Sequence, residues 1–309
     1  MKRRLSAWVV IAATIAMVAM TAAPAAAIDT LEDYLADAEA AEYAGRRLVM
    51  TTWAGDAEVG IYDVTHAGDV TVIGDGQTSV SSGKVAAEGG GVSVLDWSRS
   101  GLADRYSVVE VGAVERIGRE ARAVDIYEGN LRRAAITFDD ATGAPLVTQM
   151  YDADGDLFRY SAMLDFDDRP NVVYRDIETT GLDYDVMVPV ADPSMPVELA
   201  GYQRTDAYRS ADDWMHTFYS DGLFSFSVFE AGKAVTLSEF AAAGTFESGR
   251  RSYSLLVRPT EIWVTWRTGG TTMVLVGDLP PDHLENVLAD LPEPDRPGFL
   301  KRLWRGIFG

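Results

Sequence analysis

The stretch FYSDGLFSFSV, residues 218–228, combines a turn signal with a strand pattern. The dipeptide Asp221-Gly222 is typical of a tight hairpin turn, and apolar residues alternate with serine from Phe224 to Val228. Successive side chains of a strand point to opposite faces. We therefore expect the phenylalanine and valine face to pack in a core, so that only the serine face and the turn stay candidates for contact with another molecule.

Around this stretch the second half of the chain mixes strand-like runs with helical segments. A Pro-containing segment, residues 181–196, predicts a linker, and residues 197–291 predict a small α+β domain. One helix is expected at TLSEFAAAG, residues 236–244, and another after Pro280-Pro281, where apolar residues recur at helical spacing until Pro292 stops it. The expected strands are 214–220, 223–229, 250–257, 261–266 and 271–277.

The first half of the mature chain, residues 28–180, is rich in short β-type runs. A short amphipathic helix is predicted after the cap candidates Asp29 and Thr30. Nine β-rich runs separated by Gly, Asp and Asn follow between Arg47 and Tyr174. This pattern predicts a large antiparallel sheet, curved or half-closed into a barrel, so that the whole chain belongs to the α+β class.

The chain begins with the features of an exported protein. Residues 1–27 combine a basic start, an apolar run from Ala7 to about Met20 and a small-residue site ending at Ala27, which is typical of a cleaved secretory signal peptide. There is no cysteine, so no disulfide stabilises the fold. The formal net charge of −20 argues against nucleic acid as a partner.

No motif in the sequence indicates catalysis, a cofactor or a metal site. The three histidines, His66, His216 and His283, are far apart and are interpreted as surface or structural residues. No nucleophile elbow, zinc-protease motif, phosphate-binding loop or dinucleotide fingerprint is present. The run YDADGDLF lacks the spacing of a calcium loop, so we expect a hairpin turn at Asp154-Gly155.

An ordered set of segments resembles the RseB/MucB regulators of extracytoplasmic sigma factors. In the first half these segments are EYAGRRLVMTTW, YSVVEVGAVERIGREARAVDIY and ITFDDATGAPLVTQMYDADGDLFRYSAM. In the second half they are YSDGLFSFSV, SGRRSYSLLV and VGDLPPDHLENVLADL. The resemblance implies a first domain similar to the carriers LolA and LolB, an unclosed antiparallel half-barrel with helices, followed by a smaller α+β domain.

The resemblance also implies a regulatory and non-enzymatic role. Such a protein binds the extracytoplasmic domain of a membrane-spanning anti-sigma factor and shields it from proteolysis, while the first domain senses a lipid or other amphiphile. Trp53, Met150 and Met163 are expected to pack in the core, with the wall of a ligand pocket as the alternative. The candidate partner-binding residues are Tyr219, Ser220, Asp221, Gly222, Ser225 and Ser227.

The C-terminal segment, residues 292–309, is a Pro-rich spacer followed by a basic amphipathic end. Its apolar and basic residues separate on a helical wheel, which predicts contact with a membrane surface; packing on the second domain is the alternative. The candidate membrane-contact residues are Phe299, Leu300, Lys301, Arg302, Leu303, Trp304, Arg305, Ile307 and Phe308. A lipid or lipoprotein carrier, located outside the cytoplasm like the regulator, is the alternative function for the whole chain.

Overall fold

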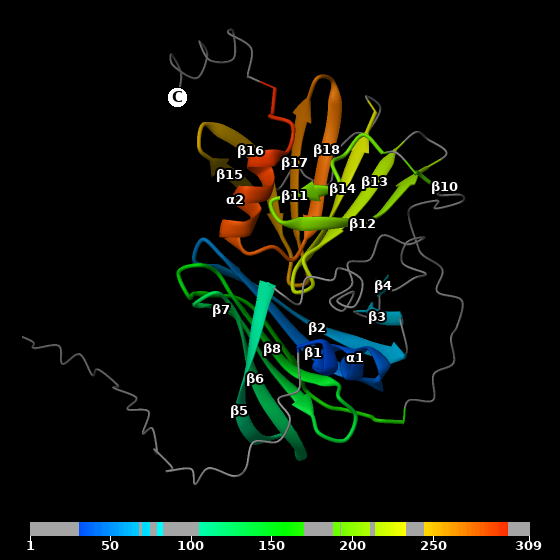
Figure 1. Cartoon of the computed structure of the whole chain (residues 1–309), viewed down its shortest axis with the longest axis vertical. Coiled ribbons are helices and arrows are strands. Elements are labelled where there is room, and N and C mark those ends of the chain that lie inside the picture. Colours follow the sequence, from blue (N-terminus) through cyan, green and yellow to red (C-terminus); the bar gives the residue numbers. More distant parts are fainter. Residues whose placement is uncertain are drawn as a thin grey trace, which may run out of the picture.

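Two antiparallel sheets form the framework of the protein (Figure 1). The computed structural model describes residues 31–67, 70–74, 79–82, 105–169, 188–191, 193–210, 214–232 and 244–295. The predicted signal peptide, all but the last residue of the helix expected at 236–244, and the tail residues 296–309 lie outside the described residues; Gly244 itself lies in a strand. We call α1 with the first sheet the first lobe, and the second sheet with α2 the second lobe.

The first sheet confirms the expected unclosed antiparallel architecture. Its order is β4-β3-β2-β1-β9-β8-β7-β6-β5, so the described sheet begins at β4 and ends at β5 without closing. The helix α1 buries Tyr34, Leu35 and Ala38, as its helical spacing predicts. The elements are α1 Leu31–Ala40, β1 Glu42–Trp53, β2 Asp56–Ala67, β3 Val70–Gly74, β4 Ser79–Ser82, β5 Tyr106–Arg116, β6 Arg119–Glu128, β7 Leu131–Asp139, β8 Pro145–Tyr151 and β9 Leu157–Met163.

The second sheet has the order β10-β12-β13-β14-β18-β17-β16-β15, with β11 paired to β12. The helix α2 begins at Pro281, as predicted, and buries Leu284, Val287 and Leu288 completely. The elements are β10 Val188–Pro189, β11 Glu198–Leu199, β12 Tyr202–Arg209, β13 Met215–Ser220, β14 Ser225–Ala231, β15 Gly244–Ser248, β16 Arg251–Val257, β17 Ile262–Thr268, β18 Thr271–Gly277 and α2 Pro281–Asp290.

Part of the segment predicted as a linker belongs to the second sheet. The strand β10 pairs with β12, and Met195 is buried in the main hydrophobic core. The guanidinium of Arg204 donates to the carbonyl oxygen of Met195 at 2.6 Å. The domain boundaries at residues 180 and 197 stay predictions, but residues 188–191 and 193–196 are attached to the second lobe.

The two lobes share one hydrophobic core. The ring of Trp53 in β1 packs edge-on against Phe246 in β15, with ring centroids 5.8 Å apart, and Phe158 in β9 lies 6.2 Å from Phe224. These contacts belong to a single cluster of buried apolar residues that draws on both sheets, α1 and α2. Trp53 and Met150 lie in this cluster, and Met163 lies in a smaller second cluster, so the expectation that they pack in a core is confirmed.

The loop between β8 and β9 confirms the hairpin predicted at Asp154-Gly155. The carboxylate of Asp152 accepts hydrogen bonds from the backbone N–H groups of Asp154 at 3.0 Å and Asp156 at 2.9 Å. Gly155 has φ +82°, a conformation that glycine adopts at little cost. The carboxylate of Asp152 therefore stabilises the turn itself.

Candidate functional site at the seam between the lobes

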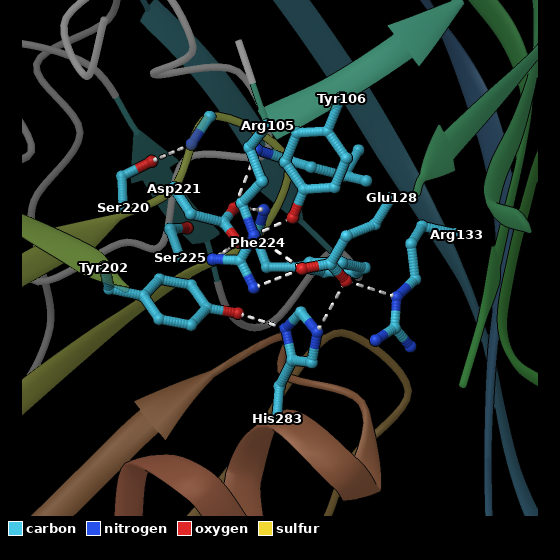
Figure 2. Close-up of polar contacts among 12 residues, drawn as sticks. Arg105, Tyr106, Glu128, Arg133, Tyr202, Ser220, Asp221, Phe224, Ser225 and His283 are labelled. Atoms are coloured by element: carbon cyan, nitrogen blue, oxygen red, sulfur yellow. Dashed lines mark hydrogen bonds and ion pairs between the residues drawn. The ribbon is translucent and has the colours of Figure 1, made fainter. Parts of the chain in front are cut away.

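Polar and charged side chains from both lobes meet where the first sheet contacts the second lobe (Figure 2). We call this cluster the lobe seam. It consists of Arg105, Tyr106, Glu128 and Arg133 from the first lobe, and Tyr202, Asp221, Asp282 and His283 from the second.

Strand pairing brings the four residues of the first lobe together. Tyr106 opens β5 and pairs with Glu128, the last residue of β6, which in turn pairs with Leu131 at the start of β7. Arg105 directly precedes β5, and Arg133 follows two residues after Leu131. Residues far apart along the chain therefore lie at one end of the sheet, the end that faces the second lobe.

Asp221 is the acceptor at the centre of the seam. One carboxylate oxygen, Oδ1, accepts from the backbone N–H groups of Leu223 at 3.0 Å and Phe224 at 2.8 Å, which closes the turn between β13 and β14. The other oxygen, Oδ2, accepts from the hydroxyl of Tyr106 at 2.6 Å and lies 3.1 Å from Nη1 of Arg105. Asp221 is completely buried, so it ties the turn of the second lobe to β5 of the first.

Glu128 and His283 form the second half of the seam. Glu128 accepts from Arg105 at 2.6 Å and from Arg133 at 2.8 Å, and Nε2 of His283 lies 3.4 Å from its Oε2. The other ring nitrogen of His283, Nδ1, lies 2.5 Å from the hydroxyl of Tyr202. Arg133 also donates to Asp282 at 2.9 Å, so it bridges the lobes directly.

The environment of the seam favours an ionised Glu128 and protonated Tyr106 and Tyr202. A hydrogen bond from His283 holds the pKa of Glu128 well below its usual range against the opposing effect of burial, and Arg105 and Arg133 act in the same direction. Burial raises the pKa of Tyr202 and of Tyr106, and Asp221 raises both further. Both phenols therefore keep their protons at neutral pH, which suits donation from Tyr106 to Asp221 and from Tyr202 to His283.

A second buried cation lies beside the seam. The Nε of Arg159 in β9 donates to the hydroxyl of Thr51 at 3.2 Å, and its Nη1 lies 3.9 Å from Asp278 of the second lobe. Its Nη2 has no hydrogen-bond partner among the described residues. Burial lowers the pKa of Arg159 and raises that of Asp278, so this wide pair is a weaker electrostatic contact than those of Glu128.

The structure buries most of the side chains that the sequence proposed for partner contact. Tyr219, Asp221 and Ser220 are buried at the end of β13 and in the turn, and Gly222 is only partly exposed. Tyr219 donates to the carbonyl oxygen of Pro196 at 2.6 Å, and the hydroxyl of Ser220 accepts from the N–H of Gly222 at 3.1 Å. Their role in binding a partner stays a prediction.

The serine face of β14 that was proposed for partner contact is also buried. Ser225 and Ser227 are 5% and 4% exposed, because β14 lies inside the sheet between β13 and β18 and both of its faces are covered. The hydroxyl of Ser227 lies 2.8 Å from Nε2 of His216, and the backbone N–H of Ser225 donates to Asp278 at 2.9 Å. Both serines therefore have internal hydrogen-bond partners.

The three histidines are structural, as the sequence indicates, and all three are buried. His216 stacks on Phe229 with ring centroids 4.4 Å apart, and His66 stacks on Tyr43 at 5.1 Å. Among the described residues no group of three or more His, Cys, Asp or Glu side chains is arranged to hold a metal ion. The side chains of the seam bind one another and hold the lobes together.

Sequence reasoning missed the pairing of the seam residues. Arg105, Glu128 and Tyr202 were not singled out, and Asp221 was interpreted as a turn former and as a candidate for partner contact, not as a link between the lobes. One available signal was the position of the charged residues at the ends of strands and beside the N-terminus of the helix at Pro281. Side chains at such positions can reach a neighbouring element. That signal does not say which charge pairs with which.

Comparison with known proteins gives likenesses among solved structures only; no family model and no curated protein matches the chain. The MucA/MucB complex of Pseudomonas aeruginosa matches at 18% identity and TM-score 0.48, covering 86% of this chain and 99% of that one. MucB in complex with MucA(peri) matches at 18% identity and TM-score 0.49, covering 86% and 97%.

A LolA superfamily protein from Nitrosomonas europaea matches at 9% identity and TM-score 0.20, covering 82% of this chain and 96% of that one. In the part of the chain that the structure describes, no helix has the length and apolar character needed to cross a membrane.

Proposed function

We propose that this protein binds the extracytoplasmic domain of a membrane-spanning anti-sigma factor and shields it from proteolysis. The observation that carries the proposal is that three segments of the RseB/MucB resemblance meet at the lobe seam. These segments contribute Tyr106, Asp221 and His283, and the hydroxyl of Tyr106 contacts Asp221 at 2.6 Å. The ring of Phe224 lies 5.1 Å from that of His283.

The contacts among these segments give a physical reason for their occurrence together in the sequence. Tyr106, Asp221 and His283 lie at least 62 positions apart along the chain, and each segment alone is an ordinary strand, turn or helix start. Together they supply the acceptor, the donors and the ring contacts that set one lobe against the other. A protein that holds a partner across two lobes needs such a defined relative position, because a preorganised surface loses less entropy on binding.

The seam also favours a binding role over a catalytic one. Its carboxylates, Asp221 and Glu128, already accept hydrogen bonds from neighbouring side chains, and Tyr106 and His283 are buried against them. A general acid or base must reach the proton that it transfers. These groups instead face each other across the two lobes.

The test mixes the purified protein with the purified extracytoplasmic domain of the candidate anti-sigma factor. We expect a stable complex by isothermal titration calorimetry, and slower cleavage of that domain by the envelope-stress protease when the protein is present. A matched reaction with an unrelated secreted protein of similar acidity controls for nonspecific protection. Absence of binding and of protection would refute the proposal.

Mass spectrometry under native conditions detects any lipid bound to the purified protein. It therefore tests whether the first lobe senses an amphiphile, and it tests the alternative of a lipid or lipoprotein carrier. The regulator proposal expects a lipid to weaken the complex with the partner domain. A stoichiometric lipid in the purified protein, together with no binding of the anti-sigma domain, would instead favour the carrier.

Membrane contact through the tail residues 299–308 remains a separate proposal, because this segment lies outside the described residues. Its basic and apolar residues suit an anionic lipid surface. The full chain should sediment with anionic liposomes more than a chain truncated at Pro297. Equal sedimentation of the two chains would contradict membrane contact.

A further inference from the structure

The strand β5 forms an edge of the first sheet and exposes apolar side chains along its length. Among the described residues, β5 pairs only with β6 and ends the strand order opposite β4 (Figure 1). Val109, Val111 and Val114 are 51%, 55% and 40% exposed, and Ile117 in the following turn is 38% exposed. We call β5 with this turn the β5 edge.

The tip of the β5 edge carries backbone strain. Arg116 pairs with Arg119, so Ile117-Gly118 is a two-residue hairpin turn, and Ile117 adopts φ +49°. Asn, Asp or Gly is the usual residue at such a position, whereas a β-branched residue there is an outlier that costs about 1–3 kcal/mol. Ile117 is 38% exposed, so the turn holds an apolar side chain partly in solvent at the tip.

The edge itself indicates the kind of occupant. The outer side of an edge strand presents backbone N–H and C=O groups that only water or another extended chain satisfies. Apolar side chains beside such groups are the features that strand-addition sites use, with main-chain hydrogen bonds for affinity and side-chain contacts for selectivity. The β5 edge therefore suits an extended peptide segment better than a helix or a small molecule.

The charges on β5 favour a segment of another protein over a second copy of this chain as the occupant. Glu110 and Glu115 are exposed on the strand, while Arg116 donates to Tyr160 of β9 at 3.3 Å. A second copy would bring the same carboxylates and a formal net charge of −20 against this edge. A segment that alternates apolar and basic residues complements both the valines and the glutamates.

A bulge gives the edge a specific shape. The pairing of β5 with β6 shifts between Glu110 and Gly112, which leaves Val111 as the extra residue, and Gly112 adopts φ +136°. A bulge bends an edge strand and discourages unselective pairing. The opposite end of β5 begins at Tyr106 in the lobe seam, so the edge is anchored at one end and exposed at the other.

We propose that the β5 edge binds an extended segment of the partner as an added strand, with apolar side chains over the exposed valines and basic side chains beside Glu110 and Glu115. This inference rests on the proposed function, since the partner is the extracytoplasmic domain named there. The added strand runs between the lobe seam and the hairpin tip. It satisfies the outer backbone groups of β5 and covers Ile117.

Amide hydrogen exchange tests the backbone part of the proposal on the unmodified protein. Addition of the purified partner domain should slow exchange in the peptide that covers residues 106–118, by about tenfold or more at amides that gain a strand partner. The peptide that covers β2, residues 56–67, is the internal control and should not change. Unchanged exchange in 106–118 in the presence of a formed complex would overturn the inference.

Paired variants test the side-chain part. Val111→Lys places a charge on the β5 edge, and Val59→Lys places the same charge at an equally exposed valine of β2. We expect V111K to weaken binding of the partner domain by about tenfold or more and V59K to leave it within about twofold. Circular dichroism and thermal unfolding check that both variants fold, and Ile117→Asn, which relieves strain, should also weaken binding.

The outcomes distinguish this inference from the proposed function. If the wild-type protein does not bind the partner domain, the proposed function fails and the inference fails with it. If the wild type binds but V111K and V59K bind equally well, only the β5 edge is refuted. If sedimentation shows that the protein alone is a dimer that V111K dissociates, the occupant is a second copy of this chain and the inference is wrong.

Discussion

The two ends of β5 lie in opposite environments, one in the lobe seam and the other at the β5 edge. At its first residue, Tyr106, β5 is buried against charge, whereas from Val109 to Val114 it exposes apolar side chains to solvent. Globular proteins usually place charge outside and apolar groups inside. Both regions depart from that rule. In the seam the cost of burying charge is offset by ion pairs and hydrogen bonds within the chain, whereas the exposed apolar side chains of β5 have no such compensation.

The difference shows what each region is for. A buried charge network holds two surfaces in one relative position, since removing a central member such as Asp221 leaves its donors from the other lobe without their acceptor. An exposed apolar edge has no such internal compensation, and it becomes favourable only when another chain covers it. The seam is therefore a contact within the protein, and the β5 edge is a contact that awaits a partner.

The largest expected effect comes from removing the central acceptor of the seam. Asp221→Ala leaves the hydroxyl of Tyr106, the guanidinium of Arg105 and two turn N–H groups without their acceptor. We expect a loss of about 3–5 kcal/mol in the free energy of unfolding, measured by urea denaturation. Ser220→Ala removes a single hydrogen bond in the same turn and should cost only about 1 kcal/mol. Equal losses in the two variants would mean that Asp221 acts only in the turn.

Two buried arginines provide the next comparison. Arg133 contacts Glu128 at 2.8 Å and Asp282 at 2.9 Å, whereas Arg159 has its nearest carboxylate at 3.9 Å. Arg133→Met should cost about 2 kcal/mol, because Glu128 keeps Arg105 and His283, whereas Asp282 loses its arginine and keeps the backbone N–H of Ala153 at 3.3 Å. Arg159→Met should change the free energy of unfolding by less than about 1 kcal/mol, because a methionine of similar shape replaces a poorly paired charge. A larger loss for R159M than for R133M would reverse this ranking of the contacts.

The pH dependence of stability should distinguish the seam from the interior of the second lobe, because their buried groups titrate in different pH ranges. Burial lowers the pKa of His216 to about 4 from a usual 6.5, so between these values the unfolded chain binds a proton that the folded chain excludes. Stability therefore falls as the pH falls, by about 2 kcal/mol from pH 7 to pH 5 for this group. His216→Gln should remove that part of the pH dependence, as measured by urea unfolding at both pH values.

Glu128 responds in a lower pH range. Because its pKa is lowered in the folded state from 4.5, its contribution is complete above about pH 4.5 and is lost as the pH falls further. In the H216Q background, the loss of stability that remains should therefore begin below about pH 4.5, and Glu128→Gln should flatten it. If H216Q unfolds with the same pH dependence as the wild type between pH 7 and pH 5, the buried His216 is not the cause.

The smallest expected effect is a gain of stability at the β5 edge. Ile117→Asn replaces a β-branched residue at φ +49° by one that tolerates this conformation. The free energy of unfolding should rise by about 1 kcal/mol, measured by thermal or urea unfolding. Val114→Asn, at an exposed position of the same strand without positive φ, is the control and should not stabilise. A destabilised I117N would mean that Ile117 makes an internal contribution.

Local patterns predicted most of the elements. Leu284, Val287 and Leu288 recur at helical spacing after Pro281, and α2 buries them as predicted. The strand β12 was not predicted, because its sequence YQRTDAYR contains few apolar residues and most of its side chains are half-buried. The serine face of β14 was kept as a candidate for partner contact because alternation distinguishes two faces but does not tell whether the second one is covered.

The candidate site could not be predicted in the same way. Tyr106 and Asp221 are 115 residues apart in the chain, and Arg133 and Asp282 are 149 apart. Nothing in the local sequence of Glu128 distinguishes it from the many other carboxylates of an acidic chain. The segments of the family resemblance include Tyr106, Asp221 and Asp282 but neither Glu128 nor Arg133, and the resemblance does not state which of these residues touch.

The sequence by itself determined where most of the strands, the turns and the described helices lie, because hydrophobic periodicity and turn residues act over a few neighbouring positions. It also determined that the chain must find stability without disulfides. Only the tertiary structure decided that Asp221 would receive Tyr106, and that β5 would end the sheet with its valines exposed. Those outcomes depend on the order of strands and the placement of the lobes, which sum many distant contacts that no short stretch encodes.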